Sequence, residues 1–109
     1  MNIGDAVELV KDIPGKKLYS GMQGTIVDTH LGAYEIEFTN SDGETIDFLS
    51  LTPDNFIVTW TIENNNFVPA ADQAIELIKR LPTQLTQQVL DFIRFISIYR
   101  QKPTTRLFD

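Results

Sequence analysis

The segment Gly21–Val27, with the sequence Gly-Met-Gln-Gly-Thr-Ile-Val, constrains the fold of this chain more than any other feature. Its two glycines lie three residues apart and lead directly into three β-branched residues. Glycine adopts the positive φ angles that a tight turn needs, and threonine, isoleucine and valine suit a half-buried strand. Strand-like segments lie on both sides, at residues 5–11 and 34–38. This pattern is typical of a turn in a small, strongly bent β-barrel, a kind of domain that binds other molecules rather than transforming them.

The first half of the chain alternates apolar and polar residues with a period of two, as antiparallel strands with one solvated face do. The apolar members, which we expect to face the core, form three groups: Tyr34, Ile36 and Phe38; Ile46 and Phe48; and Phe56, Val58, Trp60 and Ile62. Residues 40–43 and 53–55 are turn sequences, the second of them a single 3₁₀ turn. Five short strands with this spacing predict a partly open barrel of the SH3 kind.

The second half of the chain has the period of an α-helix. Five apolar residues share one face of a helix that begins near Ala70: Ala71, Ala74, Ile75, Ile78 and Leu81. Pro82 ends this helix, because proline disfavours helical geometry in the residue before it, and a second helix then runs to about Arg100. The fold class is therefore mainly β with an α-helical appendage. The predicted division of the chain is an SH3-like barrel at 1–62, a connector at 63–69, a two-helix hairpin at 70–102 and a flexible tail at 103–109.

The second predicted helix is apolar around much of its circumference. A heptad-like seam consists of Leu85, Val89, Phe92, Ile96 and Tyr99, and four more apolar residues lie outside it: Leu90, Ile93, Phe95 and Ile98. A helix that covered only one small barrel would need a single apolar face. Either the first helix and the barrel bury the remainder, or a partner chain does. We expect a partner, with homo-oligomers formed through this helix, and the predicted contact residues are Phe92, Phe95, Ile96, Ile98 and Tyr99.

Charge is distributed unevenly along the chain. Residues 1–60 carry three lysines and ten acidic residues, a net charge of −7, whereas residues 61–109 carry six basic and five acidic residues. An acidic barrel repels the phosphate backbone of nucleic acids, whose binding depends on lysine and arginine. The balance favours a basic protein partner over nucleic acid.

Several carboxylates are expected on one outer face of the barrel: Asp28, Glu35, Glu37, Glu44 and Asp47. They could form a solubilising surface, a patch that docks a basic protein, or a weak site for a divalent cation. The functional hypothesis is a docking patch made by Asp28, Glu35, Glu37 and Asp47. Catalysis by paired carboxylates would also need a cleft, for which so small a barrel leaves little room. We therefore expect no enzymatic activity, no cofactor and no metal centre.

Two further features have a functional and an ordinary interpretation. His30, beside Asp28, could act as a general base or a metal ligand, but the pair makes neither a catalytic triad nor a complete metal shell, so we expect a solvent-facing side chain. Lys11, Lys16 and Lys17 surround a turn between the first two strands. These lysines are either simply exposed to solvent, or they contact nucleic acid, which is the alternative function. The sequence contains no phosphate-binding or hydrolase motif.

Cysteine is absent, which excludes disulfides and thiolate metal sites. The first residues show neither the basic nor the apolar region of a secretory signal, and no apolar run approaches the ~20 residues of a membrane span. We expect a cytoplasmic protein that does not bind membranes.

Five motifs in register resemble domain-of-unknown-function family 4926: residues 5–14, residues 21–27, residues 34–38, Asp42-Gly43 and Leu51-Thr52-Pro53. The resemblance covers residues 3–60 and implies a short SH3-like barrel. The turn at 21–27 is also similar to the KOW-type element of ribosomal and transcription-factor barrels, although the acidic charge departs from those RNA binders.

The second helix brings another resemblance. Residues 81–95, with Leu-Pro and Val-Leu-Asp-Phe-Ile-x-Phe, resemble the uncharacterised helical family 2281, which is common in cyanobacteria and looks like a small antitoxin-type or accessory segment. This resemblance covers residues 71–100. Neither family brings an agreed activity, so no catalytic residue is carried over. Together they imply a bacterial, cyanobacterial accessory protein, and the functional hypothesis is an antitoxin- or immunity-like neutraliser of a basic protein.

Overall fold

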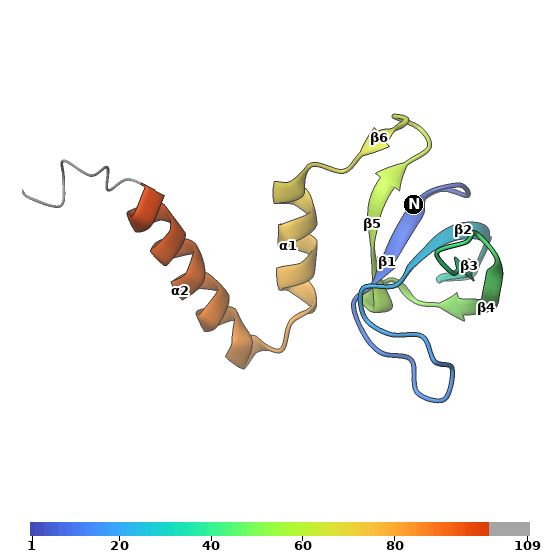
Figure 1. Cartoon of the computed structure of the whole chain (residues 1–109), viewed down its shortest axis with the longest axis horizontal. Coiled ribbons are helices and arrows are strands. Elements are labelled where there is room, and N and C mark those ends of the chain that lie inside the picture. Colours follow the sequence, from blue (N-terminus) through green and yellow to red (C-terminus); the bar gives the residue numbers. More distant parts are fainter. Residues whose placement is uncertain (101–109) are drawn as a thin grey trace, which may run out of the picture.

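A computed structural model describes residues 1–100, which form a six-stranded antiparallel sheet followed by two helices (Figure 1). The strands are β1 (Ala6–Leu9), β2 (Gln23–His30), β3 (Ala33–Thr39), β4 (Thr45–Leu51), β5 (Phe56–Thr61) and β6 (Asn66–Phe67). A 3₁₀ turn, η1 (Pro53–Asn55), precedes β5, as predicted. The helices are α1 (Ala70–Arg80) and α2 (Thr83–Arg100), separated at Pro82 as expected. The predicted tail at 103–109 lies outside the described residues.

The sheet is open rather than closed into a barrel. Its strand order is β4-β3-β2-β1-β5-β6, which leaves β4 and β6 as the edges. The prediction of a partly open, five-stranded barrel is therefore wrong in strand number, and the sheet is not a barrel. The strand that was missed is β6, whose two residues pair with Trp60 and Thr61 of β5. They lie in the segment predicted as a connector, and Asn65 makes the turn before them with a φ of 48°.

The core lies on one face of the sheet. Its buried side chains are Val7, Leu9, Leu18, Ile26, Ile36, Phe38, Leu51 and Phe56. The predicted inward face of residues 34–38 is confirmed, because Ile36 and Phe38 are fully buried and Tyr34 packs edge-to-face on Phe56 with 6.0 Å between ring centroids. The small size of this cluster leaves much apolar surface elsewhere on the chain.

The faces of β4 are reversed relative to the prediction. Phe48 and Ile46 are 51% and 42% exposed, whereas Leu51 is buried in the core. Asp47 pairs with the buried Phe38, so it lies on the inner side of the strand. The pairing with β3 accounts for the change, because Leu51 and Asp47 are opposite the inward-facing Tyr34 and Phe38, whereas Phe48 is opposite the outward-facing Glu37.

The two glycines of the turn at 21–27 serve different purposes. Gly21 has a φ of +94°, the left-handed geometry expected for the turn. Gly24 lies inside β2 opposite Phe38, and a Cβ there would be 2.6 Å from Cγ2 of Ile36 and 2.8 Å from the carbonyl oxygen of Glu37. The close approach of β3, rather than an unusual φ angle, therefore requires glycine at position 24.

A buried carboxylate ties the N-terminus to the end of β5. Asp5 is 2% exposed and accepts hydrogen bonds from the backbone N–H groups of Asn2 at 2.9 Å and Ile62 at 3.0 Å. Ile62 itself is 50% exposed, so the predicted inward alternation of residues 56–62 does not extend to that residue. Ile57, which the alternation placed outside, is 1% exposed.

Helix α1 covers the outer face of β5, where Ile57 is buried. Figure 1 shows α1 alongside β5, and α2 on the far side of α1 from the sheet. The described chain is elongated, with extents of 58 × 32 × 28 Å and a radius of gyration of 17.7 Å. A compact domain of about 100 residues has a radius of gyration near 13 Å. The expected helical cover over the sheet is thus provided by α1 and not by α2.

Candidate protein-interaction surfaces

Helix α2 leaves most of its apolar side chains open to solvent. It has no buried residue within a single chain. Eight large apolar residues are exposed: Leu85, Leu90, Phe92, Ile93, Phe95, Ile96, Ile98 and Tyr99. The five predicted contact residues are all among them, with exposures from 46% for Ile96 to 74% for Tyr99.

Three aromatic residues form a continuous stripe along α2. The rings of Phe92 and Phe95 stack with centroids 6.5 Å apart, and those of Phe95 and Tyr99 with centroids 5.9 Å apart. Residues three and four positions apart are neighbours on a helix surface, which explains the contacts. Large aromatic side chains dominate the energetics of protein interfaces, so this stripe is a strong candidate for a contact surface.

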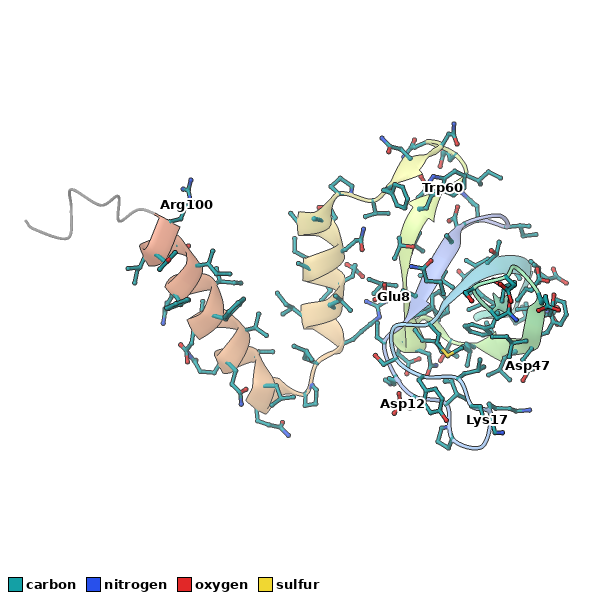
Figure 2. The ribbon with its side chains drawn as sticks, viewed as in Figure 1. Glu8, Asp12, Lys17, Asp47, Trp60 and Arg100 are labelled. Carbon is teal, nitrogen blue, oxygen red and sulfur yellow. The ribbon has the colours of Figure 1, made fainter. Side chains whose placement is uncertain are left out.

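An apolar groove of about 570 Å³ lies between α1, α2 and β1. Its walls are Ala74, Leu77 and Ile78 from α1, Leu81 directly after it, and Val89, Phe92, Ile93 and Ile96 from α2. Glu8 of β1 lines it from the side of the sheet that faces α1 (Figure 2). The predicted apolar face of the first helix therefore divides, since Ile75 lines a different hollow next to the sheet.

The proposed acidic patch is assembled only in part. Asp28 and Glu35 are direct partners across β2 and β3, and Glu37 lies two residues further along the same face of β3. Glu37 also accepts a hydrogen bond from the Thr45 hydroxyl at 2.5 Å. Asp47 does not belong to this face, because the register of β4 turns it inward. Its predicted role in the patch is therefore wrong.

Phe48, which the prediction placed in the core, lies on this outer face, and the predicted Glu44 lies next to it. Phe48 pairs with Glu37 and is exposed, so an aromatic ring lies beside the carboxylates. Glu44 lies in the turn between β3 and β4, where its carboxylate accepts a hydrogen bond from the Asn40 side chain at 3.2 Å. Exposed aromatic rings are enriched at protein contacts, and carboxylates beside one can add complementary charge toward a basic partner.

His30 is half-exposed at the end of β2, as expected. Its Nε2 lies 4.0 Å from Oδ2 of Asp28, and the ligand atoms of Asp28, His30 and Glu35 all lie within 4.8 Å of one another. Two carboxylates and one imidazole can ligate a divalent cation. The three groups are on the surface of the hairpin, where acidic clusters without an ion are common, so their proximity alone does not make a metal site.

The lysine loop is partly neutralised by its own chain. Nζ of Lys11 lies 3.0 Å from Oδ2 of Asp54. A hydrogen bond from Thr52, and after it the bond from Lys11, lower the pKa of the Asp54 carboxyl. Lys16 and Lys17 remain exposed at the tip of the loop, where Figure 2 shows Lys17. The structure thus leaves two of the three predicted basic contacts unpaired among the described residues.

Arg80 is a residue that sequence reasoning missed. Its guanidinium reaches from the end of α1 to Pro53 in the 3₁₀ turn η1, and it also pairs with Glu76 at 3.0 Å. The spacing of four residues between Glu76 and Arg80 is a signal for the ion pair. The sequence contains no signal for the contact of Arg80 with Pro53.

The model of a family described as a domain of unknown function, DUF4926, matches residues 3–58. This range runs from the N-terminal turn to the middle of β5 and covers just over half of the chain. No curated protein and no solved structure matches significantly. The family comparison gives no support for the resemblance of residues 71–100 to family 2281. Among residues 1–100, neither helix is long and apolar enough to cross a membrane.

Proposed function

This chain belongs to the DUF4926 family, and on that premise we propose that it is a protein-interaction module without enzymatic activity. The family description names no activity, so support must come from the residues themselves. The observation that carries the proposal is α2, an 18-residue helix with eight large apolar side chains exposed and none buried. Contiguous apolar surface of this kind marks an interaction site on a folded protein.

The proposed partner is a basic protein that docks on the acidic outer face of the sheet. Residues 1–60 carry a net charge of −7, and Asp28, Glu35 and Glu37 gather on one face with the exposed Phe48 beside them. Complementary charge raises the rate of association and excludes partners of the wrong sign. The exposed apolar residues of α2 would supply a second contact surface for protein association: Phe92, Phe95, Ile96, Ile98 and Tyr99. Neutralising a basic protein would make the chain an antitoxin- or immunity-like accessory protein.

The test is affinity purification of the tagged full-length chain after nuclease treatment, followed by mass spectrometry. We expect one stoichiometric basic protein, bound less well as ionic strength rises. A Glu35→Lys, Glu37→Lys variant should lose it. Glu63→Lys, at an exposed position outside the acidic face, is the matched control and should retain it.

Two results would reject the proposal. Capture that is unaffected by the double charge reversal would exclude the acidic face as the docking surface. Capture that disappears with nuclease would favour the alternative contact through Lys16 and Lys17, in which nucleic acid is the ligand.

A further inference from the structure

We infer that the apolar groove between α1 and α2 is closed by a second copy of this chain, the two helix pairs forming a four-helix bundle. This inference rests on the proposed function and deepens it, because it names the occupant of the helical contact surface. The basic partner is then left to the acidic face of the sheet.

The apolar residues of α2 cover more of the helix circumference than the part that lines the groove in its own chain. Val89, Phe92, Ile93 and Ile96 line the groove, and helical periodicity places Phe95 and Tyr99 next to them on one side. Phe95 and Tyr99 are 61% and 74% exposed. An arc this wide is characteristic of a helix in a bundle, which contacts more than one neighbouring helix. Within one chain, α2 has only α1 as a helical neighbour.

The exposed area matches the requirement of a stable dimer. Taking about 200 Å² for a fully exposed large apolar side chain, the six exposed residues on the groove side of α2 leave on the order of 650 Å² uncovered per chain: Leu85, Phe92, Ile93, Phe95, Ile96 and Tyr99. A standard protein–protein interface buries about 800 Å² on each partner. A symmetric pair of these helices would therefore approach standard size, and the groove residue Leu77 of α1, 37% exposed, adds to the buried area.

Charge selects a second copy over a basic protein at this surface. Residues 61–100 contain four acidic residues (Glu63, Asp72, Glu76 and Asp91) and four basic residues (Lys79, Arg80, Arg94 and Arg100), so their net charge is zero. A neutral helix pair neither attracts a basic protein nor repels its own copy. The acidic sheet lies on the far side of α1 from α2, so bundling through α2 keeps the two acidic sheets apart (Figure 1).

The proposed contact also produces a closed dimer. Contact between the same surface on both chains is isologous, and such an interface forms a two-fold dimer rather than an open filament. Because each groove faces an identical groove, the walls of both are buried in one step. The dimer would present two acidic faces, one at each end, to two molecules of the basic partner.

Light scattering coupled to size-exclusion chromatography of the full-length chain tests the inference. We expect a mass of about 25 kDa, twice the 12.4 kDa of one chain, which falls to one chain in Phe92→Glu and in Phe95→Glu. Leu90→Glu is the matched control, because Leu90 is exposed at 41% but does not line the groove and lies on the opposite side of α2 from Phe92, Phe95 and Tyr99. It should remain a dimer. All three side chains are exposed in the single chain, so circular dichroism should show unchanged folding.

A wild-type mass of one chain at high concentration would overturn the inference, as would a dimer that survives both phenylalanine substitutions. These failures are separable from failure of the proposed function. Partner capture is tested through Glu35 and Glu37, which lie on the sheet and should not affect the mass of the chain alone. A monomer that still captures the basic protein would reject the bundle and leave the proposed function in place.

Discussion

The guanidinium of Arg80 donates two hydrogen bonds to the backbone carbonyl oxygen of Pro53, from Nε at 3.1 Å and from Nη2 at 3.0 Å. Arg80 is the last residue of α1, and Pro53 is the first residue of η1. The Arg80 side chain is only 14% exposed, so the contact is shielded from water. It joins the helix, which lies outside the range matched by the family, to a turn within that range.

Replacing Arg80 with alanine should loosen α1 from the sheet. Charge-assisted hydrogen bonds contribute about 1.5–3 kcal/mol, so we expect the free energy of unfolding to fall by about 2 kcal/mol. Urea denaturation measures the loss, and hydrogen exchange should show faster exchange in α1. Lys79→Ala is the control, since Lys79 pairs with the same Glu76 but is 65% exposed. Equal effects of the two substitutions would show that the bonds to Pro53 contribute nothing.

Asp5→Ala should destabilise the sheet. The carboxylate accepts two backbone hydrogen bonds, and its removal would leave the N–H groups of Asn2 and Ile62 without this partner. We expect a loss of about 2–4 kcal/mol, with a smaller loss for Asp5→Asn, which retains one acceptor oxygen. Denaturation midpoints measure both. An asparagine variant as unstable as the alanine variant would mean that the negative charge matters more than the bond count.

Gly24→Ala should cost more stability than Gly21→Ala. A Cβ at position 24 would collide with Ile36 and with the backbone of β3, which we expect to cost about 3 kcal/mol. At position 21 a Cβ meets open space, and only the left-handed φ opposes it, at about 1 kcal/mol. The order of the two thermal midpoints is the measurement, and a reversed order would contradict the packing of β2 on β3.

Stability should decline in acid partly through Glu76. Hydrogen bonds from Lys79, and then from Arg80, lower the pKa of Glu76 below its ordinary value of 4.5. A carboxyl with a lowered folded-state pKa contributes stability above its unfolded pKa and loses it as pH falls through the folded value. The difference in thermal midpoint between wild type and Glu76→Gln should therefore be full above pH 4.5 and vanish in stronger acid. A difference that grows on acidification would reverse the assigned sign. The group is solvent-exposed, so high salt should shrink the difference.

The parts of the fold that could be predicted are those whose sequence pattern allows only one structural interpretation. Tyr34, Ile36 and Phe38 have only one possible inward face, and the structure confirms it. Proline at position 82 has only one effect on a helix, and the helices do separate there. Both signals are local, and no distant contact is needed to interpret them.

The errors arise where the sequence pattern allows two interpretations, or where a contact joins residues that are far apart in the sequence. In β4, Ile46 and Phe48 favour one face, but Leu49 and Leu51 favour the other, and alternation cannot choose between them. The pairing of Leu51 with Tyr34 and of Asp47 with Phe38 makes the choice, and that is a property of two strands together. It also removes Asp47 from the acidic face. The contact of Arg80 with Pro53 spans 27 positions and uses a backbone carbonyl, a group that every residue has.

Helix α2 contributes no side chain to the buried cluster that holds the sheet together. Substitutions along it are therefore nearly invisible to folding, and selection can act on them for recognition alone. Substitutions in α2 could therefore change the associations of this chain while its sheet stays the same. The sequence of α2 would then diverge faster than that of the core, where a substitution destabilises the sheet.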